Sequence, residues 1–104
     1  MILRSWSAIA STTGADAYVA YFRGTLLPAL RRLEGHRGAL VLARREGEED
    51  MRVTVLTLWD SMASIRRFAG ADTTAAVVEP EAQALLARFD ARAEHFEVLV
   101  DART

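Results

Sequence analysis

The sequence predicts an α+β protein with a ferredoxin-like, four-stranded antiparallel sheet that carries its helices on one face. The first observation is the order of periodic segments along the 104 residues, which is strand, helix, strand, strand, helix, helix, strand. The second is segment 52–59, where apolar side chains occupy both alternating faces, as is typical of a central strand. The third is the length, which suits one domain spanning residues 1–104. Right-handed crossovers then favour the strand order 4-1-3-2.

The first half of the chain predicts a strand, a long helix and a second strand. Residues 2–9 alternate as a strand, and Thr13 is a candidate N-cap in the turn that follows. The next helix has an apolar stripe spaced by fours and threes, formed by Tyr18, Phe22, Leu26, Leu30 and Leu33. Pro28 lies within this helix, so we expect a kink there before Gly35 ends the helix. Residues 38–45 alternate as the second strand.

The second half predicts the central strand, two helices and a last strand. The charged residues 46–50 suit an exposed hairpin loop, and Asp60 or Ser61 caps the helix after the central strand. The apolar stripe of that helix is Met62, Ile65, Phe68 and Ala69, and we expect Gly70 to end it. Pro80 suits the first position of a last helix, whose apolar face is Leu85, Leu86 and Phe89. In the final strand, 95–100, Phe96 lies on the face opposite His95.

The central strand also predicts a partner. Its two alternating sets of side chains are both non-polar, so both faces of the sheet must be covered. The helices of a chain this short can cover one face only. A second copy of the same chain is the simplest cover for the other face, so we expect a homodimer that packs sheet to sheet.

Composition excludes several classes of function. The net charge of −1 offers no field that would gather nucleic acid or an anionic membrane. Cysteine is absent and the two histidines lie 59 positions apart, so we expect no metal centre. The start has no charged leader followed by a long apolar run, and no segment approaches the roughly 20 apolar residues of a membrane span. We therefore expect a cytoplasmic protein that binds neither nucleic acid nor membrane.

Seven short motifs, in order along the chain, resemble the antibiotic biosynthesis monooxygenase family of the dimeric α/β-barrel superfamily. They are Ala-Asp-Ala-Tyr at 15–18, Leu-Pro-Ala-Leu at 27–30, Glu-Gly-His-Arg-Gly-Ala at 34–39, Leu-Trp-Asp-Ser at 58–61, Arg-Phe-Ala-Gly at 67–70, Ala-Val-Val at 76–78 and His-Phe-Glu-Val at 95–98. The resemblance implies a homodimer with facing sheets and a small-molecule pocket between each sheet and its own helices. It implies one of two activities, cofactor-free oxygenation of polycyclic phenols or quinols, or haem degradation.

The sequence departs from the haem-degrading branch of that family. Those relatives hold the porphyrin with an Asn on the first strand, a Trp on the second helix and a His shortly after it. This chain has no Asn, Phe68 takes the helix position, and the later position falls near Val78. We therefore do not expect haem degradation, and we expect no cofactor.

His95 is the candidate catalytic residue. A histidine has a pKa near working pH and could take the proton of a phenolic substrate. The alternative is an interface histidine bonded to a carboxylate such as Glu97. Strict alternation places His95 opposite Phe96 and so, we expect, away from the helix-covered core, which favours the interface role.

Aromatic residues are the candidates for binding a substrate. Trp6 and Arg4 share a face of the first strand and could hold an anionic ring substituent, or could pack in a dimer interface. Trp59 could stack on a planar substrate, although a tryptophan at a strand end is more often a core anchor. Phe68 and Phe22 are further candidates, and Phe22 is most simply a core residue.

Two functions follow from these observations. The first is a cofactor-independent monooxygenase acting on a phenolic or quinol-type small molecule. The alternative is a non-catalytic dimeric module that binds a small ligand or only its partner chain. An open cavity with inward polar groups would favour the enzyme, whereas a cavity filled by Phe68, Phe89, Leu85 and Trp59 would favour the module.

Overall fold

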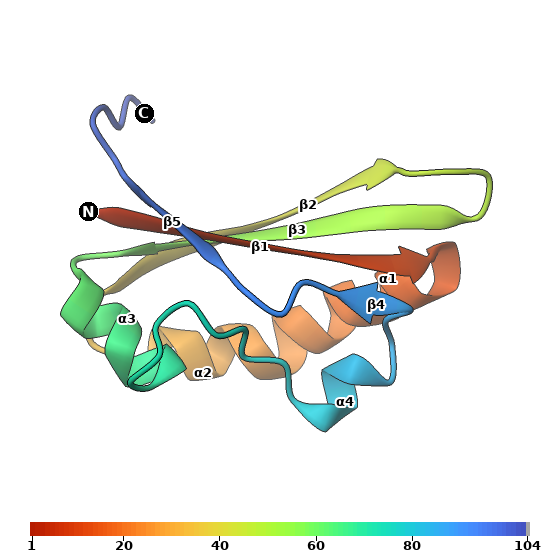
Figure 1. The fold of residues 1–104 in the computed structure, drawn as a ribbon, viewed down its shortest axis with the longest axis horizontal. Helices are drawn as coiled ribbons and strands as arrows, with labels where there is room; N and C mark the ends of the chain where they lie inside the picture. The colour runs from red at the N-terminus through yellow and green to blue at the C-terminus, as the bar shows by residue number, and fades with distance from the viewer. Residues whose placement is uncertain (104) are drawn as a thin grey trace.

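A single antiparallel sheet with helices against one face forms the molecule, which we describe from a computed structural model covering residues 1–103 (Figure 1). The sheet follows the order β2-β3-β1-β4, and β5 also pairs with β1. The strands are β1 (Ile2–Ser11), β2 (His36–Arg45), β3 (Asp50–Trp59), β4 (Arg88–Phe89) and β5 (Glu94–Glu97). The helices are α1 (Thr12–Tyr21), the π-helical turn η1 (Phe22–Leu26), α2 (Leu27–Arg31), α3 (Met62–Ala69) and α4 (Pro80–Gln83). The predicted ferredoxin-like class is confirmed.

Two short strands share the free edge of β1, where one strand was expected. β5 pairs with Ile2–Ser5, and β4 pairs with Ala8 and Ile9. The predicted last helix is therefore wrong beyond Gln83, because Phe89 lies in β4. Ala87 donates to the Ile9 carbonyl at 2.8 Å, and pairing with an open strand edge has overridden the helical spacing of the apolar residues.

The long first helix changes its pitch where a kink was predicted. It begins at Thr12 with Ser11 as the N-cap, two residues before the predicted Thr13, since the Ser11 hydroxyl accepts from the Gly14 N–H at 3.0 Å. Just before Pro28 the helix passes through η1, where the Leu27 N–H donates to the Phe22 carbonyl five residues back. This wider turn accommodates the proline ring, which lacks an N–H and would crowd a regular α-helix.

The second helix, α3, begins and ends as its sequence predicts. The Ser61 hydroxyl accepts from the Ser64 N–H at 3.2 Å, so Ser61 rather than Asp60 is the cap. Gly70 ends the helix with a φ of 86°. Asp60 forms an ion pair with Arg37 instead.

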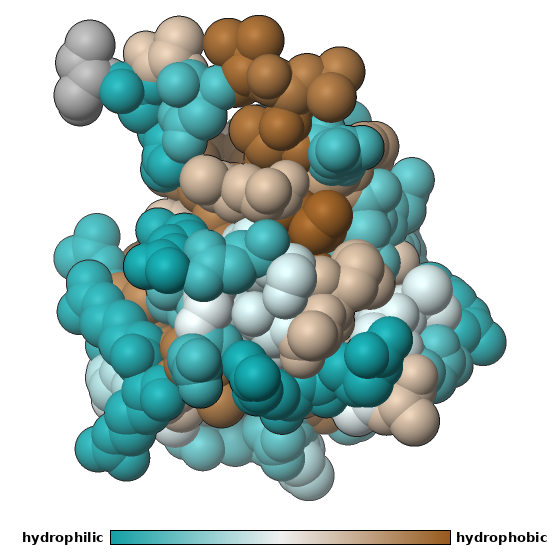
Figure 2. All heavy atoms as spheres, turned by 90° about the vertical axis from the view of Figure 1, so that its left-hand side faces the viewer, coloured by the Kyte–Doolittle hydropathy of each residue, from teal (hydrophilic) through white to brown (hydrophobic). Residues whose placement is uncertain are grey.

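The core lies between the sheet and the helices. Val53, Val55 and Trp59 of β3 point into it, where they meet Leu30 and Ile65. The opposite face of the sheet, which we call the open face, carries non-polar side chains without a cover: Leu40 is 52 % exposed and Phe96 is 51 % exposed. Figure 2 shows further non-polar side chains gathered near the C-terminal segment, and Leu99 and Val100 are exposed there.

Gly35 connects α2 to β2 at a position where a side chain cannot fit. Its φ is 91°, and an added Cβ would lie 2.6 Å from Cβ of Ser64. We expect Gly35→Ala to lower the free energy of unfolding by at least about 2 kcal/mol, because strained backbone and overlap with α3 add together. Urea unfolding measures this loss. Gly47→Ala is the matched control because an added Cβ there meets nothing within 4 Å, and an equal loss in both variants would contradict the prediction.

Candidate functional site

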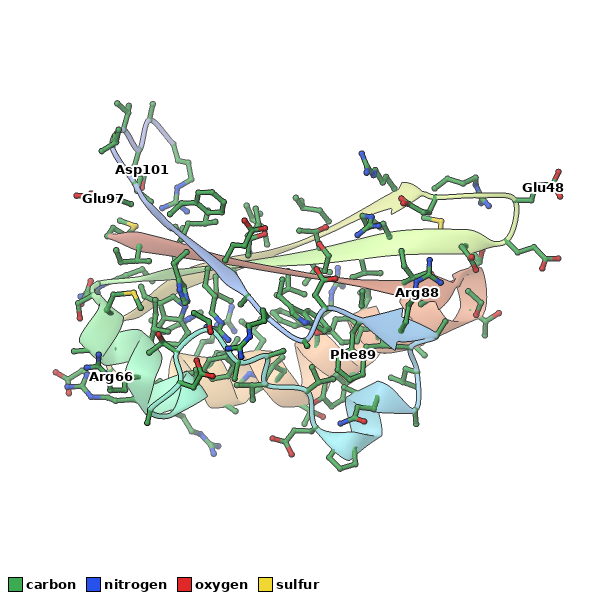
Figure 3. The ribbon with its side chains drawn as sticks, viewed as in Figure 1. Glu48, Arg66, Arg88, Phe89, Glu97 and Asp101 are labelled. Carbon is green, nitrogen blue, oxygen red and sulfur yellow. The ribbon has the colours of Figure 1, made fainter. Side chains whose placement is uncertain are left out.

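A cavity of about 350 Å³ lies between the helix-covered face of the sheet and the helices. Its wall is mainly aromatic and aliphatic, and it is open rather than filled by core side chains. The lining residues are Trp6, Tyr18, Tyr21, Thr25, Leu26, Ala29, Leu33, Arg67, Phe68, Val77, Val78, Glu79 and Ala82. Figure 3 shows the side chains that fill this layer and places Arg66 on the outer side of α3.

The first helix and β1 form much of this wall because of their spacing. Tyr18, Tyr21 and Thr25 recur every three or four residues, so they lie on one side of the helix. Trp6 faces them from β1, with its ring centre 6.2 Å from that of Tyr18. The Trp6 indole N–H donates to the Asp90 carbonyl at 2.8 Å, which fixes the orientation of the ring.

A smaller hollow of about 40 Å³ adjoins the cavity on the side of the sheet. The two spaces share Trp6, Tyr18, Leu26, Phe68 and Val77 in their walls. Arg4, Leu30, Val55 and Thr57 complete the wall of the inner hollow, so a strand arginine lies at its end. The cavity thus runs from an exposed mouth to a buried cation.

Arg4 is 4 % exposed, and neutral groups surround its guanidinium. Nη2 donates to the Ala75 carbonyl at 2.8 Å, and Nη1 donates to the Thr73 carbonyl. The guanidinium carbon also lies 5.6 Å from the centre of the Phe68 ring. Burial lowers the pKa of Arg4, but an arginine keeps its charge in proteins. Within residues 1–103 no salt bridge includes Arg4.

His95 lies beside Arg4, on the helix-covered face. The two residues are register partners of β5 and β1, so their side chains share a face, and Nη1 of Arg4 lies 2.9 Å from Nε2 of His95. The expectation that His95 points away from the covered face is therefore wrong. Alternation does place His95 opposite Phe96, but Phe96 lies on the open face and is not in the core.

Burial, and then the charge of Arg4, lower the pKa of His95 below its usual 6.5. The neutral ring accepts the Arg4 hydrogen bond through Nε2, which assigns its proton to Nδ1. His36 also has a lowered pKa, caused by burial and by Arg31. Both rings are therefore neutral at pH 7.

Stability should fall as pH drops below about 6.5. In the unfolded chain His95 takes up a proton there, whereas the folded chain resists protonation until lower pH, so acid favours unfolding. Urea unfolding at pH 7.5 and 5.5 measures the difference, and His95→Gln should remove part of it. The carboxylates with lowered pKa values titrate mainly below this window. An unchanged pH dependence in the variant would contradict the assignment to His95.

The other sequence candidates fall into two groups. Trp6, Arg4 and Phe68 line the cavity or its inner hollow. Trp59 is 0 % exposed, stacks on Phe68 at 5.6 Å and donates to the Thr57 hydroxyl at 2.8 Å, so it lies behind the wall. Phe22 is buried in the core and is not among the lining residues.

Five polar or tyrosine side chains in the wall were not among the sequence candidates: Tyr18, Tyr21, Thr25, Arg67 and Glu79. The spacing of the first three was a usable signal, but it also fits a core stripe. Burial raises the pKa of both tyrosines, so each keeps its proton and can donate a hydrogen bond. Arg67 and Glu79 are exposed at the mouth.

The wall does not suit haem. Neither histidine lines it, and the tyrosines resist the ionisation that an iron ligand requires. Phe68 and Val78 occupy positions in this wall, so the sequence departures from haem-degrading relatives fall inside the cavity.

Among residues 1–103 no group of three or more His, Cys, Asp or Glu residues could hold a metal ion. The helices described here are all too short or too polar to cross a membrane.

The sheet order, the helices on one face and a pocket between them define the ferredoxin-like fold of the antibiotic biosynthesis monooxygenase proteins. Three solved structures show this similarity. A Bacillus cereus protein named as an antibiotic biosynthesis monooxygenase superposes with a TM-score of 0.65 at 14% identity, over 99% of this chain and 97% of that one. The Mycobacterium tuberculosis heme-degrader, with two hemes in its active site, gives 0.63 at 21%, over 99% and 100%. A cofactor-independent oxygenase from Streptomyces nogalater gives 0.58 at 15%, over 99% and 98%.

These similarities establish the fold, as the sequence resemblance predicted. No protein-family model matches the chain. No curated protein sequence matches it either.

Proposed function

We propose that this protein is a cofactor-independent monooxygenase that oxidises a phenolic or quinol-type small molecule with molecular oxygen. The observation that carries the proposal is an open, aromatic-walled cavity whose inner end is lined by Arg4, with His95 hydrogen-bonded to Arg4 from behind. Trp6, Tyr18 and Phe68 would hold a planar ring, and Arg4 would favour negative charge on the substrate. The similarity in fold to a Streptomyces nogalater protein named a cofactor-independent oxygenase supports the proposal that this chain oxygenates without a cofactor.

The reaction needs oxygen as its only other reactant. Loss of the phenolic proton gives an anion, which transfers one electron to oxygen and then combines with the resulting superoxide at carbon. The resulting peroxide anion takes back the proton removed at the start, and the hydroperoxide then loses water to leave a new carbonyl. One oxygen atom thus enters the product and the other leaves as water. His95 is the proposed proton acceptor, and its hydrogen bond from Arg4 must open for Nε2 to take the proton.

The alternative is a module that binds a small ligand and performs no chemistry. One observation favours it: His95 is not among the residues that line the cavity or the inner hollow. The group best suited to accept a proton therefore lies behind Arg4, and direct contact with a ligand would require Arg4 to move.

Oxygen uptake with anthrone tests the proposal. We expect the wild-type protein to consume one O2 per anthrone and to form anthraquinone and water, with one atom of O2 in the new carbonyl, and His95→Ala to be slower by at least about 100-fold. His95→Gln separates two roles, since a glutamine oxygen can still accept from Arg4 but cannot act as a base. If His95 is the base, both variants are slow. If it only positions Arg4, the glutamine variant keeps most of the activity.

His36→Ala is the matched control, because it removes the other histidine, which lies outside the cavity wall. Wild-type uptake no faster than in buffer, together with measurable ligand binding, would support the binding module instead. Uptake unaffected by His95→Ala would exclude His95 from the mechanism.

The proposal includes a homodimer formed through the open face. Leu40, Leu56 and Phe96 lie on that face, which no helix of the chain covers. A monomer rarely exposes a large contiguous apolar surface, and pairing two such faces removes both from water.

A further inference from the structure

We infer that Arg4 is an anion-binding group, and that the substrate binds as an aromatic anion with a carboxylate or phenolate oxygen directed at this guanidinium. The inference deepens the proposed function, on which it rests for placing the substrate in this cavity. It names the charge that a substrate must carry, which the aromatic wall alone does not.

The charge of Arg4 has no ion-pair partner within residues 1–103. Five salt bridges occur within residues 1–103, and all of them join other residues. Burying a cation without an anion is costly, and arginine cannot relieve the cost by losing its proton. An anion bound in the inner hollow would lie next to the Arg4 guanidinium and would offset the free-energy cost of burying its charge.

The hydrogen bonds of Arg4 also leave room for a ligand. Its guanidinium has five N–H donors, and the structure uses three of them, on the Thr73 carbonyl, the Ala75 carbonyl and His95. All three partners are neutral, since His95 has its pKa lowered by burial and by Arg4 itself. Two donors of a buried, fully charged group are thus available, and carboxylate and phenolate oxygens are strong acceptors.

Among the residues that the structure describes, no charged side chain other than Arg4 lines the inner hollow, so none would repel or attract an anion there. The remaining wall of the inner hollow is Trp6, Tyr18, Leu26, Leu30, Val55, Thr57, Phe68 and Val77. Tyr18 has a raised pKa and stays neutral. Arg67 and Glu79, the charged residues of the outer wall, are exposed and screened by water. Low-polarity walls strengthen the attraction between Arg4 and an anion, so the charge discriminates between ligands of the same shape.

The connector between α3 and α4 holds Arg4 in position. Its Thr73 and Ala75 carbonyls receive two of the hydrogen bonds, and His95 receives the third from the strand side. The connector is itself tied to the chain beyond β4, because Ala76 donates to the Ala91 carbonyl at 3.0 Å and Ala93 donates to the Thr74 carbonyl at 2.8 Å. His95 is therefore a positioning residue in this binding step, whatever its part in later proton transfer.

Binding of 2-naphthoate and 2-naphthamide tests the inference, since the two probes have the same shape and differ in charge. Isothermal titration at pH 7.5 should show that the wild-type protein prefers the carboxylate by at least about tenfold. Arg4→Met should abolish the preference, and Arg4→Lys should retain part of it. Arg66→Gln is the matched control, since it removes one positive charge from the outer side of α3 and should leave the preference intact (Figure 3).

A second probe, a phenolate, tests whether the site binds phenolates as well as carboxylates. A nitronaphthol, whose phenolate is coloured, should bind wild-type protein with its pKa lowered and should lose that shift in Arg4→Met. Binding of naphthoate alone would assign the site to carboxylates, and a shift of the naphthol alone would assign it to phenolates.

Equal affinity of the wild-type protein for naphthoate and naphthamide would overturn the inference, as would a preference that survives in Arg4→Met or binding of neither probe. The wild-type comparison decides the matter even if Arg4→Met fails to fold. Neither naphthoate nor naphthamide is oxidised in this assay. Failure of the charge preference is thus separate from failure of oxygen uptake, which would overturn only the proposed activity.

Discussion

Replacing Trp59 with alanine is expected to lower the free energy of unfolding by about 3–5 kcal/mol, the range seen when a fully buried large aromatic side chain is removed. Trp59 is 0 % exposed and stacks on Phe68 at 5.6 Å, and His36 meets its ring at 5.1 Å in an edge-on arrangement. A void in its place would leave these rings without a partner. A domain of this size has about 5–15 kcal/mol in total, so the variant should be close to unfolding.

Urea unfolding at a fixed protein concentration measures the loss, which keeps any contribution from dimerisation constant. Trp59→Phe is the matched control. It retains a ring against Phe68 and loses the smaller part of the indole volume and the 2.8 Å hydrogen bond to the Thr57 hydroxyl, so it should cost less, about 1–2 kcal/mol. A loss below about 1 kcal/mol for the alanine variant would mean that the site collapses easily and that Trp59 is not an anchor.

The same substitution bears on the cavity. Phe68 forms part of its wall, and Trp59 supports Phe68 from behind. Ligand binding should therefore weaken in Trp59→Ala even where the protein remains folded, although Trp59 does not line the cavity. The residue belongs to the core and influences the site through its neighbour.

Local patterns in the sequence were sufficient to predict most of the fold. Non-polar side chains on both faces of residues 52–59 identified the central strand, and Asp60 or Ser61 and Gly70 marked the ends of α3. The segment after Gln83 was misassigned because Leu85, Leu86 and Phe89 have helical spacing, whereas the open edge of β1 offered backbone hydrogen bonds to residues 87–90. Spacing within a segment contains no information about such a distant edge.

The candidate site was also predicted only in part, because local spacing does not give the register between distant strands. Alternation placed Arg4 with Trp6 and placed His95 opposite Phe96, and both relations are present. Which of the two faces of β5 meets the helices depends on its register with β1, and that register joins Arg4 to His95 across 91 positions of sequence. Phe96 was expected on the helix-covered face, yet it lies on the open face.

The second prediction with a large expected effect concerns dimerisation through the open face. Leu56→Glu places a carboxylate in the middle of the open face, between Ser5 of β1 and Leu40 of β2. In a two-fold symmetric dimer each protomer would bring the same charge into the interface. The wild-type protein should sediment as a dimer at micromolar concentration, and the variant should be monomeric, with a dissociation constant raised by at least about 100-fold.

Ala63→Glu is the matched control, because it adds the same side chain to an exposed position of α3, on the helical side of the molecule. It should sediment as the wild-type protein does. The cavity lies on the helix-covered face, so monomeric Leu56→Glu should still distinguish naphthoate from naphthamide if it remains folded. A monomeric wild-type protein would show that the apolar open face is tolerated in water, and would remove the dimer from the proposal while leaving the charge of Arg4 to be compensated by a ligand.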